Sequence, residues 1–279
     1  MQQPPPALYS PLSNHLMWLT TIFISVAQLL FVGIELYMLN KGFSIWDEGY
    51  YLLSYKMAQA GFYQHFTNTP FVVATLFEWF HPGIVAYRLI HLMANLFAAI
   101  FFTYVLILYL GALRISCNRK EQGLLYLLAT YAALYSYQLA VPTLSYNHLN
   151  GFFILIAQAA LMTAMLRQSL DKTTFVYLLL ASCATAILVL IKPPSFVALA
   201  FLNIVLVILF FRSKLAAKYV FIYILGVFAA LLVSLVLFLT PAQWLSYLSF
   251  MQERKTHTPY AVLKSFLTTG FEALSAGGG

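Results

Sequence analysis

Two adjacent carboxylates, Asp47 and Glu48, stand out in a chain that has only eight Asp and Glu residues among 279. They lie in the segment 44–51, SIWDEGYY, directly after the first long apolar run. Neighbouring helical residues point about 100° apart, so the pair cannot flank a glycosidic bond as the carboxylates of a glycoside hydrolase must. One carboxylate can instead act as a base towards an acceptor hydroxyl while the other orients it. We assign the base to Asp47 and expect Glu48 to assist; the plainer alternative is a helix start with solvated charges.

A base of this kind suits the transfer of a sugar from a phosphate leaving group. Phosphate leaves as an anion, so the reaction needs a nearby cation more than a general acid. Arg88 and Lys192 are the candidates. Arg88 can form two parallel bonds with a phosphate, and Lys192 would act as a point charge. The alternatives are a snorkelling interfacial residue for Arg88 and an ordinary helix flank for Lys192.

Neutral polar and aromatic residues complete the predicted site. We expect Tyr50, Tyr51 and His148 to contact sugar or acceptor, with Asn147 beside His148. For Asn147 and His148 the alternative is an ordinary role in a turn. The other histidines lack the spacing of metal ligands, so no metal site is predicted; a divalent ion as cofactor is left open.

The composition is that of a polytopic α-helical membrane protein. Apolar and aromatic residues make up 62% of the chain and charged residues 8%, whereas a soluble domain carries about 25% charged residues. The apolar runs are too long and uniform for the alternating strands of a barrel. The net charge of +7 does not indicate nucleic-acid binding, because the basic residues mostly lie in short loops between apolar runs.

Seven apolar runs are long enough to be membrane spans. Between the first two runs lies a loop, 40–82, in which residues 46–60 and 71–80 are predicted to form short helices. Ser44 can cap the first of these, which should lie along the membrane surface. The spans are predicted at residues 16–39, 84–111, 123–141, 149–166, 175–191, 196–211 and 219–239.

The basic residues predict the orientation. Loops rich in Lys and Arg face the cytoplasm. The loops after the second, fourth and sixth spans hold eight of the fifteen Lys and Arg residues, whereas the loops after the third and fifth hold only Lys192. The N-terminus and the basic loops are therefore expected in the cytoplasm. The loop 40–82, the turns at 142–148 and 192–195, and the tail from residue 240 would face outward, which puts every candidate site residue on one side. The eight basic residues are Arg114, Arg119, Lys120, Arg167, Lys172, Arg212, Lys214 and Lys218.

An Asp-Glu pair after the first span, followed by an Arg-headed second span, resembles the GT-C superfamily of glycosyltransferases. More narrowly, residues 16–240 resemble the protein O-mannosyltransferase and aminoarabinose-transferase-like group. The turns Ser145-Tyr146-Asn147 and Lys192-Pro193-Pro194 are also similar to those of bacterial members. The resemblance implies a polyprenyl- or dolichyl-phosphate sugar donor, inversion at the anomeric carbon, and Asp47 as base with Glu48 as its neighbour.

The expected protein is thus a glycosyltransferase of the plasma (inner) membrane with its site on the periplasmic or extracellular face. Residues 1–15 are expected to be a flexible lead, 16–240 the GT-C-like domain, and 241–279 an outward tail. Members of the group are usually longer, so this chain is expected to be a fragment or a minimal relative.

The acceptor, arriving from the outer aqueous side, is left open among glycan, lipid and protein. A multi-pass transporter or lipid-handling protein without covalent chemistry is the main alternative, and an assembly subunit is a third.

Overall fold

The computed structural model describes residues 11–39, 48–60, 68–77, 79, 82–138, 144–211, 214–238, 242 and 245. These residues form nine α-helices and no strand, which confirms the all-α fold class. The helices are α1 (Pro11–Met38), α2 (Glu48–Gln59), α3 (Thr69–Phe77), α4 (Ile84–Ala112), α5 (Arg119–Gln138), α6 (Tyr146–Arg167), α7 (Lys172–Ile191), α8 (Pro193–Phe211) and α9 (Lys214–Phe238).

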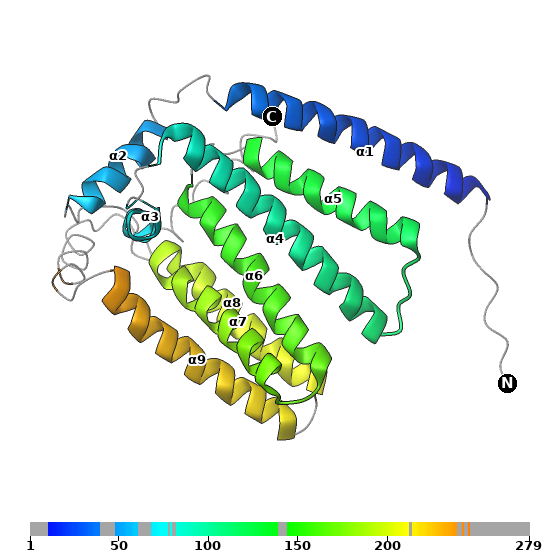
Figure 1. Ribbon diagram of the computed structural model, residues 1–279. Coiled ribbons are helices and arrows are strands. Elements are labelled where there is room, and N and C mark those ends of the chain that lie inside the picture. Colours follow the sequence, from blue (N-terminus) through cyan, green and yellow to red (C-terminus); the bar gives the residue numbers. More distant parts are fainter. Residues whose placement is uncertain are drawn as a thin grey trace, which may run out of the picture.

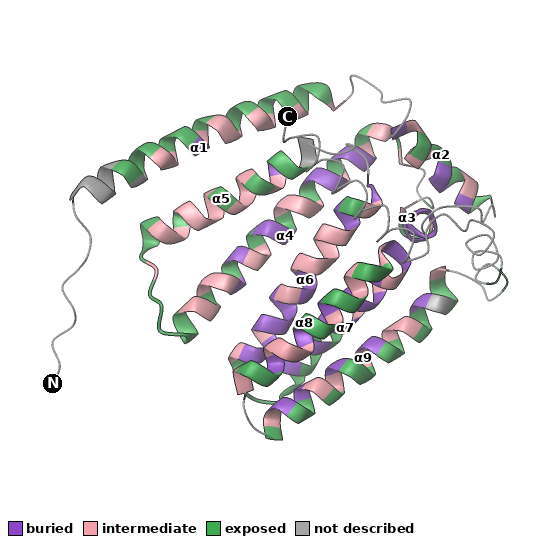
Figure 2. Cartoon of the chain, turned by 180° about the vertical axis from the view of Figure 1, so that it is seen from behind, coloured by how far each residue is buried: buried purple, intermediate pink, exposed green. Residues whose placement is uncertain are grey.

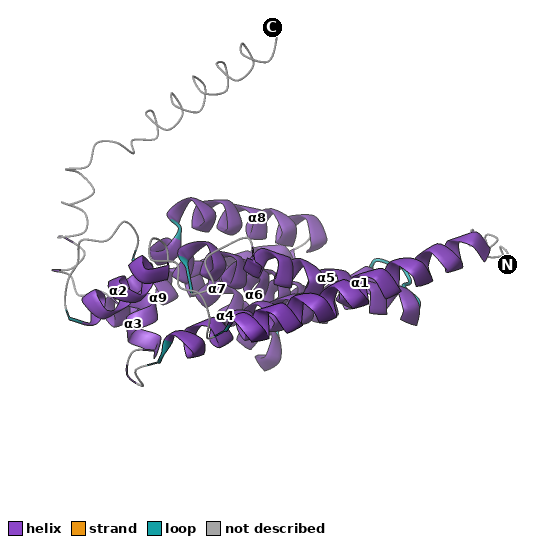
Figure 3. Cartoon of the chain, turned by 90° about the horizontal axis from the view of Figure 1, so that it is seen from above, coloured by secondary structure: helices purple, strands orange, loops and turns teal. Residues whose placement is uncertain are grey.

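The long helices form a bundle in which α4 lies between α5 and α6 (Figure 1). On one side α1 packs mainly against α5; on the other, α6 packs against α7, and α7 against α8 and α9. The short helices α2 and α3 gather at one end of the bundle, and α8 lies apart from the main layer when the bundle is viewed from above (Figure 3). One end of the bundle therefore carries the residues between the first two predicted spans.

Six of the described helices are long and apolar enough to cross a membrane: α1, α4, α6, α7, α8 and α9. Their outer faces carry large exposed apolar side chains, such as Phe23 on α1 and Val236 on α9 (Figure 2). The predicted third span is helical as α5, but α5 is not among the six. Its sequence is diluted by polar residues and tyrosines, Thr130, Tyr131 and Tyr135 among them.

Most element boundaries differ from the predicted ones by a few residues. The helix predicted at 46–60 begins at Glu48, and Ser44 lies outside the described residues. Residues Tyr146 to His148, predicted as part of a turn, form the first turn of α6. The break at Lys192 is confirmed: α7 ends at Ile191 and α8 begins at Pro193, since a Pro-Pro pair cannot continue a helix.

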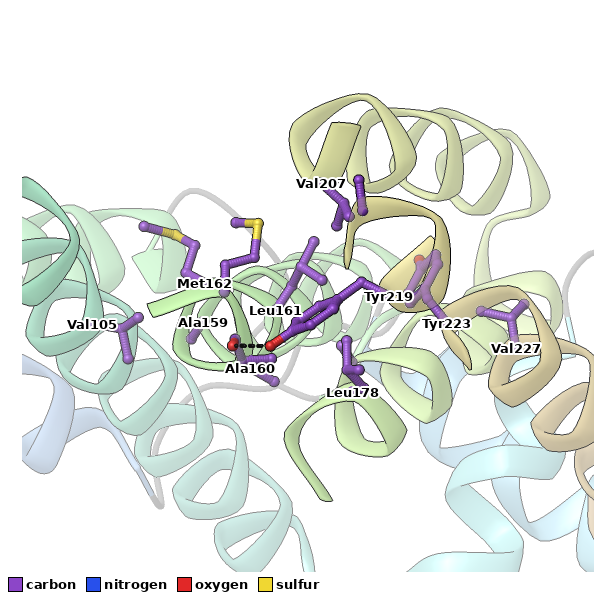
Figure 4. Packing of buried hydrophobic residues seen from close by; sticks show 14 residues of the cluster. Val105, Ala159, Ala160, Leu161, Met162, Leu178, Val207, Tyr219, Tyr223 and Val227 are labelled. Atoms are coloured by element: carbon purple, nitrogen blue, oxygen red, sulfur yellow. Dashed lines mark hydrogen bonds between the residues drawn. The ribbon is translucent and has the colours of Figure 1, made fainter. Parts of the chain in front are cut away.

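The largest buried cluster of the described residues joins α4, α6, α7, α8 and α9 (Figure 4). Alanines on α6 and α7 let these helices approach closely, which is how membrane helices gain packing energy without a hydrophobic driving force. Among them are Ala160, Ala164 and Ala181, all fully buried. From α9, Tyr219 donates a hydrogen bond to the carbonyl of Ala164 on α6 at 3.1 Å.

Helices α7 and α9 approach each other closely at Gly226. A Cβ atom at this position would lie 2.6 Å from the Ser182 Oγ and 3.0 Å from the Ser182 Cβ. We therefore expect Gly226→Ala to lower the free energy of unfolding in detergent by about 1–3 kcal/mol through overpacking. The double variant Gly226→Ala/Ser182→Gly removes the side chain that the new methyl group would meet, and it should therefore recover part of this loss in stability. Gly33→Ala, which meets nothing within 4 Å, is the matched control. Equal melting temperatures for wild type and Gly226→Ala would contradict the close contact.

At the end of the bundle away from α2 and α3, Asp171 caps α7. Its carboxylate accepts a hydrogen bond from the backbone N–H of Thr174 at 2.7 Å. This bond, with a smaller contribution from Arg167, lowers the pKa of Asp171 from 3.8 to about 2. A depressed pKa in the folded state means that the cap stabilises the fold fully above the ordinary pKa and stops doing so as the pH falls through about 2.

Melting curves in detergent at decreasing pH test this cap. The difference in melting temperature between wild type and Asp171→Ala should be constant above about pH 5 and should shrink below the ordinary pKa of 3.8. Asp171→Asn keeps a capping oxygen but cannot titrate, so its difference from Asp171→Ala should not shrink. A wild-type difference that is independent of pH would show that the carboxylate is not the cap.

Candidate functional site

A buried ion pair joins the start of α2 to the start of α4. The Arg88 Nε lies 2.8 Å from Glu48 Oε1, and Arg88 Nη2 lies 2.6 Å from Glu48 Oε2. The two side chains are 5% and 0% exposed. Two parallel charge-assisted hydrogen bonds of this kind are strong and fix both position and orientation. A bidentate pair compensates the cost of desolvating both charges only because its geometry is good.

The same guanidinium also holds the end of α1. The Arg88 Nη1 donates to the carbonyls of Met38 and Leu39 at 3.0 and 2.8 Å. These carbonyls are among the acceptors that a helix C-terminus leaves unsatisfied, and a cation there is favoured by the helix dipole. Arg88 therefore binds both ends of the segment 40–47: Leu39 immediately precedes this segment and Glu48 immediately follows it.

Asp47, the predicted base, lies outside the described residues, but its position in the chain is next to Glu48. The contacts of Glu48 and Arg88 give both residues a positioning role. With four hydrogen bonds already formed, Arg88 is a weaker candidate than Lys192 for holding an anionic group.

The tyrosines of α2 lie in different surroundings. Tyr50 is 43% exposed, and Tyr51 is half-buried, with its ring 6.4 Å from the ring of Tyr55. Tyr55 is fully buried and donates a hydrogen bond to the carbonyl of Leu144. Of these three side chains Tyr50 is the most accessible to a ligand from outside, Tyr51 is partly accessible and Tyr55 is not accessible.

Three polar residues form a stripe on the first three turns of α4. Arg88, His91 and Asn95 are spaced by three and four residues and therefore share one helix face. Asn95 Nδ2 lies 2.9 Å from His91 Nε2. The His91 ring lies 3.9 Å from the ring of His148, centroid to centroid. This contact brings the predicted residue His148 next to the stripe and one helical turn from the Glu48–Arg88 pair.

His148 has one satisfied and one unsatisfied ring nitrogen. Its Nδ1 shares a hydrogen bond of 2.7 Å with the Ser145 Oγ. Its Nε2 is buried and makes no hydrogen bond of normal geometry among the described residues. A buried polar atom without a partner costs free energy, so a group that binds Nε2 would find this nitrogen available.

Lys192 lies at the junction of α7 and α8. Its Nζ is 3.2 Å from Asn147 Oδ1 and 5.6 Å from the centre of the Tyr146 ring. Both partners are neutral, so neither contact offsets the positive charge of Lys192. Lys192 and Asn147, predicted separately, thus form one contact beside His148.

These elements meet at one end of the bundle. A buried apolar cluster contains Tyr55 of α2, Val73 of α3, Tyr87 of α4, Leu149 of α6 and Ile191 of α7. The residues predicted from the sequence therefore fall into two groups joined by the stripe on α4: Glu48 with Arg88, and Asn147 with Lys192 and His148. Tyr50 and Tyr51 lie on the adjoining α2.

Three contributing residues were missed by the sequence analysis: His91, Asn95 and Ser145. The signal for the first two was their helical spacing from Arg88 within an otherwise apolar run.

Among the described residues no three His, Cys, Asp or Glu side chains are placed to hold a metal ion. A divalent ion bound through Asp47 would involve a residue outside that set.

Comparisons with protein-family models, with curated proteins and with solved structures give no match for this chain.

Single substitutions in the buried ion pair should lower the stability of the fold far more than substitutions in an exposed ion pair. Glu48→Gln and Arg88→Met each leave one buried charge unpaired, so each should lower the free energy of unfolding by about 3–5 kcal/mol. Arg88→Lys cannot restore the two-pronged contact and should also destabilise the fold. The measurement is thermal or denaturant unfolding in detergent.

The exposed pair Arg167–Asp171, with a 3.2 Å contact and side chains 42% and 43% exposed, supplies the control. Arg167→Met should change the melting temperature far less than Arg88→Met, because solvent screens exposed pairs. Similar effects at the two positions would contradict the importance given to the buried pair.

Proposed function

We propose that this protein is a membrane glycosyltransferase that moves a sugar from a polyprenyl-phosphate donor to an acceptor hydroxyl on the non-cytoplasmic side. The observation that carries the proposal is the clamp formed by Arg88. It holds both ends of the segment that contains Asp47, at the same end of the bundle as the accessible cation Lys192. A base and an anion-binding cation are the two groups that this transfer requires.

In the proposed reaction Asp47 accepts the proton of the acceptor hydroxyl. The acceptor oxygen forms a bond to the anomeric carbon, and the bond between that carbon and the phosphate oxygen breaks. The electron pair of the broken bond leaves with the polyprenyl phosphate, whose charge Lys192 stabilises. Attack from the face opposite the phosphate inverts the anomeric centre.

The clamp supports this assignment because a base must be held within hydrogen-bonding distance of the proton it removes. A loop whose two ends are bound by one guanidinium has far fewer conformations than a free loop of the same length. Asp47 directly precedes Glu48, so its backbone is attached to a residue of the buried ion pair.

The distribution of charge supports the membrane location. Six apolar helices suit a membrane protein, and the α4–α5, α6–α7 and α8–α9 connections, together with the helix ends that adjoin them, carry the basic residues that mark a cytoplasmic face. With seven spans, α5 included, the site end faces the outer side of a plasma membrane. Glycan, lipid and protein all remain acceptor classes for the proposed reaction.

A donor-consumption assay with purified protein tests the proposal. A panel of radiolabelled polyprenyl-phosphate sugars is incubated with wild type and with Asp47→Asn in detergent. We expect wild type to release polyprenyl phosphate, and Asp47→Asn to be slower by at least about a hundredfold because it lacks the general base. Asp171→Asn, the same chemical change at the opposite end of the bundle, should keep wild-type turnover.

Two results would count against this function. Undiminished turnover by Asp47→Asn would end the assignment of the base. A folded wild-type protein that consumes none of the donors would favour a transporter or lipid-handling protein without covalent chemistry.

A further inference from the structure

A cavity of about 300 Å³ lies between α4, α5 and α6. Its floor includes Asn95 and Ala99 of α4, and its walls include Ala132 and Ser136 of α5 and His148 and Gly151 of α6. We call this cavity the α4–α6 groove. It shares His148 with the candidate site, and it extends from there towards the middle of the bundle.

The groove exists because small side chains line it. Alanines and a glycine occupy positions where larger residues would close the space, and a Cβ at Gly151 would meet no atom within 4 Å. Helices α5 and α6 each pack against α4, but over the described residues they make almost no contact with each other. The space between them is therefore bounded by α4 and is not closed by direct packing of its two walls.

The groove is polar at one end and apolar at the other. Ser136 lies in the last turn of α5 and His148 in the first turn of α6, so both belong to the site end of the bundle. Further along, the lining consists of residues such as Ala99 and Phe102 of α4 and Leu155 of α6. No charged residue is among the described residues that line it. An amphiphile with an uncharged polar end matches this gradient.

The polar end presents a specific unsatisfied atom. His148 is 6% exposed, and its Nε2 makes no hydrogen bond of normal geometry among the described residues, although Nδ1 is bound to Ser145 and the backbone of Ser136 lies beside the ring. Membrane-embedded polar atoms are normally paired, because no solvent is present to compensate them. A ligand hydroxyl satisfies Nε2 in either tautomer of the ring, since a hydroxyl both donates and accepts.

We propose that the α4–α6 groove binds an uncharged, hydroxyl-bearing, single-chain lipid, with the hydroxyl at His148 and the chain along the alanine-lined part. This inference rests on the proposed function and deepens it: such a lipid is the acceptor, and it enters from the membrane side rather than from water. It replaces the expectation of an acceptor from the aqueous phase.

An uncharged end fits the groove better than an anionic one. Burying a phosphate or carboxylate without a cation in the same cavity is costly. The neighbouring cation, Lys192, is held at Asn147, which directly precedes His148. An anionic donor at Lys192 and an acceptor hydroxyl at His148 would therefore lie side by side. The hydroxyl would then lose its proton to Asp47 as its oxygen forms the bond to the anomeric carbon, with polyprenyl phosphate leaving.

Photo-crosslinking in proteoliposomes with the full chain tests the groove. The probe is a long-chain alcohol that carries a diazirine on its chain; two companion probes have the same chain ending in a phosphate or in a methyl group. Labelled residues are located by mass spectrometry. We expect the alcohol to label the walls contributed by α5 and α6, and unlabelled alcohol to compete.

Two substitutions with one control give the specificity. Gly151→Leu should fill the groove and abolish wall labelling, whereas Gly33→Leu, at another glycine with open space around it, should leave labelling unchanged. His148→Phe keeps a ring but loses the hydrogen bond and should weaken competition by the alcohol about fivefold. If Gly151→Leu fails to fold, His148→Phe still tests the proposal by itself.

The companion probes decide the chemistry of the polar end. Groove labelling by the phosphate probe that equals or exceeds labelling by the alcohol would overturn an uncharged ligand. Equal labelling by the methyl-ended probe would overturn a hydroxyl-specific site, because the groove would then hold any membrane chain.

The binding result and the catalytic result can fail separately. Specific labelling by the alcohol, with no donor consumed by wild type, would keep the lipid site and reject the glycosyltransferase. Donor-dependent glycosylation of another acceptor that is insensitive to Gly151→Leu would keep the enzyme and overturn the groove as its acceptor site.

Discussion

The buried pair between Arg88 and Glu48 is the contact on which the end of the bundle formed by α2 and α3 depends. One guanidinium satisfies a carboxylate on α2 and two carbonyls at the end of α1, while its own helix is α4. Without it, α2 would be held by its apolar packing and by the hydrogen bond of Tyr55 to the carbonyl of Leu144, and by no ion pair among the described residues.

The same pair explains how a mostly apolar bundle can present polar chemistry at one edge. The polar residues of α4 follow one face from Arg88 through His91 to Asn95, and each is in contact with a partner from another part of the chain or from the next turn. Charge is confined to the first turn of this stripe, where it is paired. The deeper residues are neutral, as expected where the desolvation of a charge becomes more costly with depth.

The sequence predicted the helices well because apolar runs of span length have few alternatives in a membrane. It also predicted the break at Lys192, since proline acts locally. It did not predict that α5 would fall short of the apolarity of the other spans, or that His148 would stand on a helix. The grouping of site residues was partly accessible: topology placed them on one side, but only tertiary packing brings His91 against His148 and Lys192 against Asn147.

Within the described part of the bundle, two polar clusters show how structural and ligand-binding polarity differ. Between α6 and α9, Gln158 donates to Asn203, Asn203 to Tyr223, and Tyr223 to Thr185, with distances of 2.6, 2.8 and 3.0 Å. Thr185 in turn donates to the carbonyl of Ala181 at 2.8 Å, so this chain of hydrogen bonds ends on the backbone and has no need of a ligand.

The cluster around His148 ends differently. Its hydrogen bond to Ser145 leaves the other ring nitrogen unpaired beside a cavity. A completed network lowers the energy of one arrangement of helices and is a device of stability. A network with an unpaired buried atom is less favourable in free energy in the unliganded protein, and a bound group that pairs with this atom removes the difference. The position of the open cluster, one helical turn from the ion pair that anchors the segment of Asp47, is the strongest reason to place ligand binding at this end of the bundle.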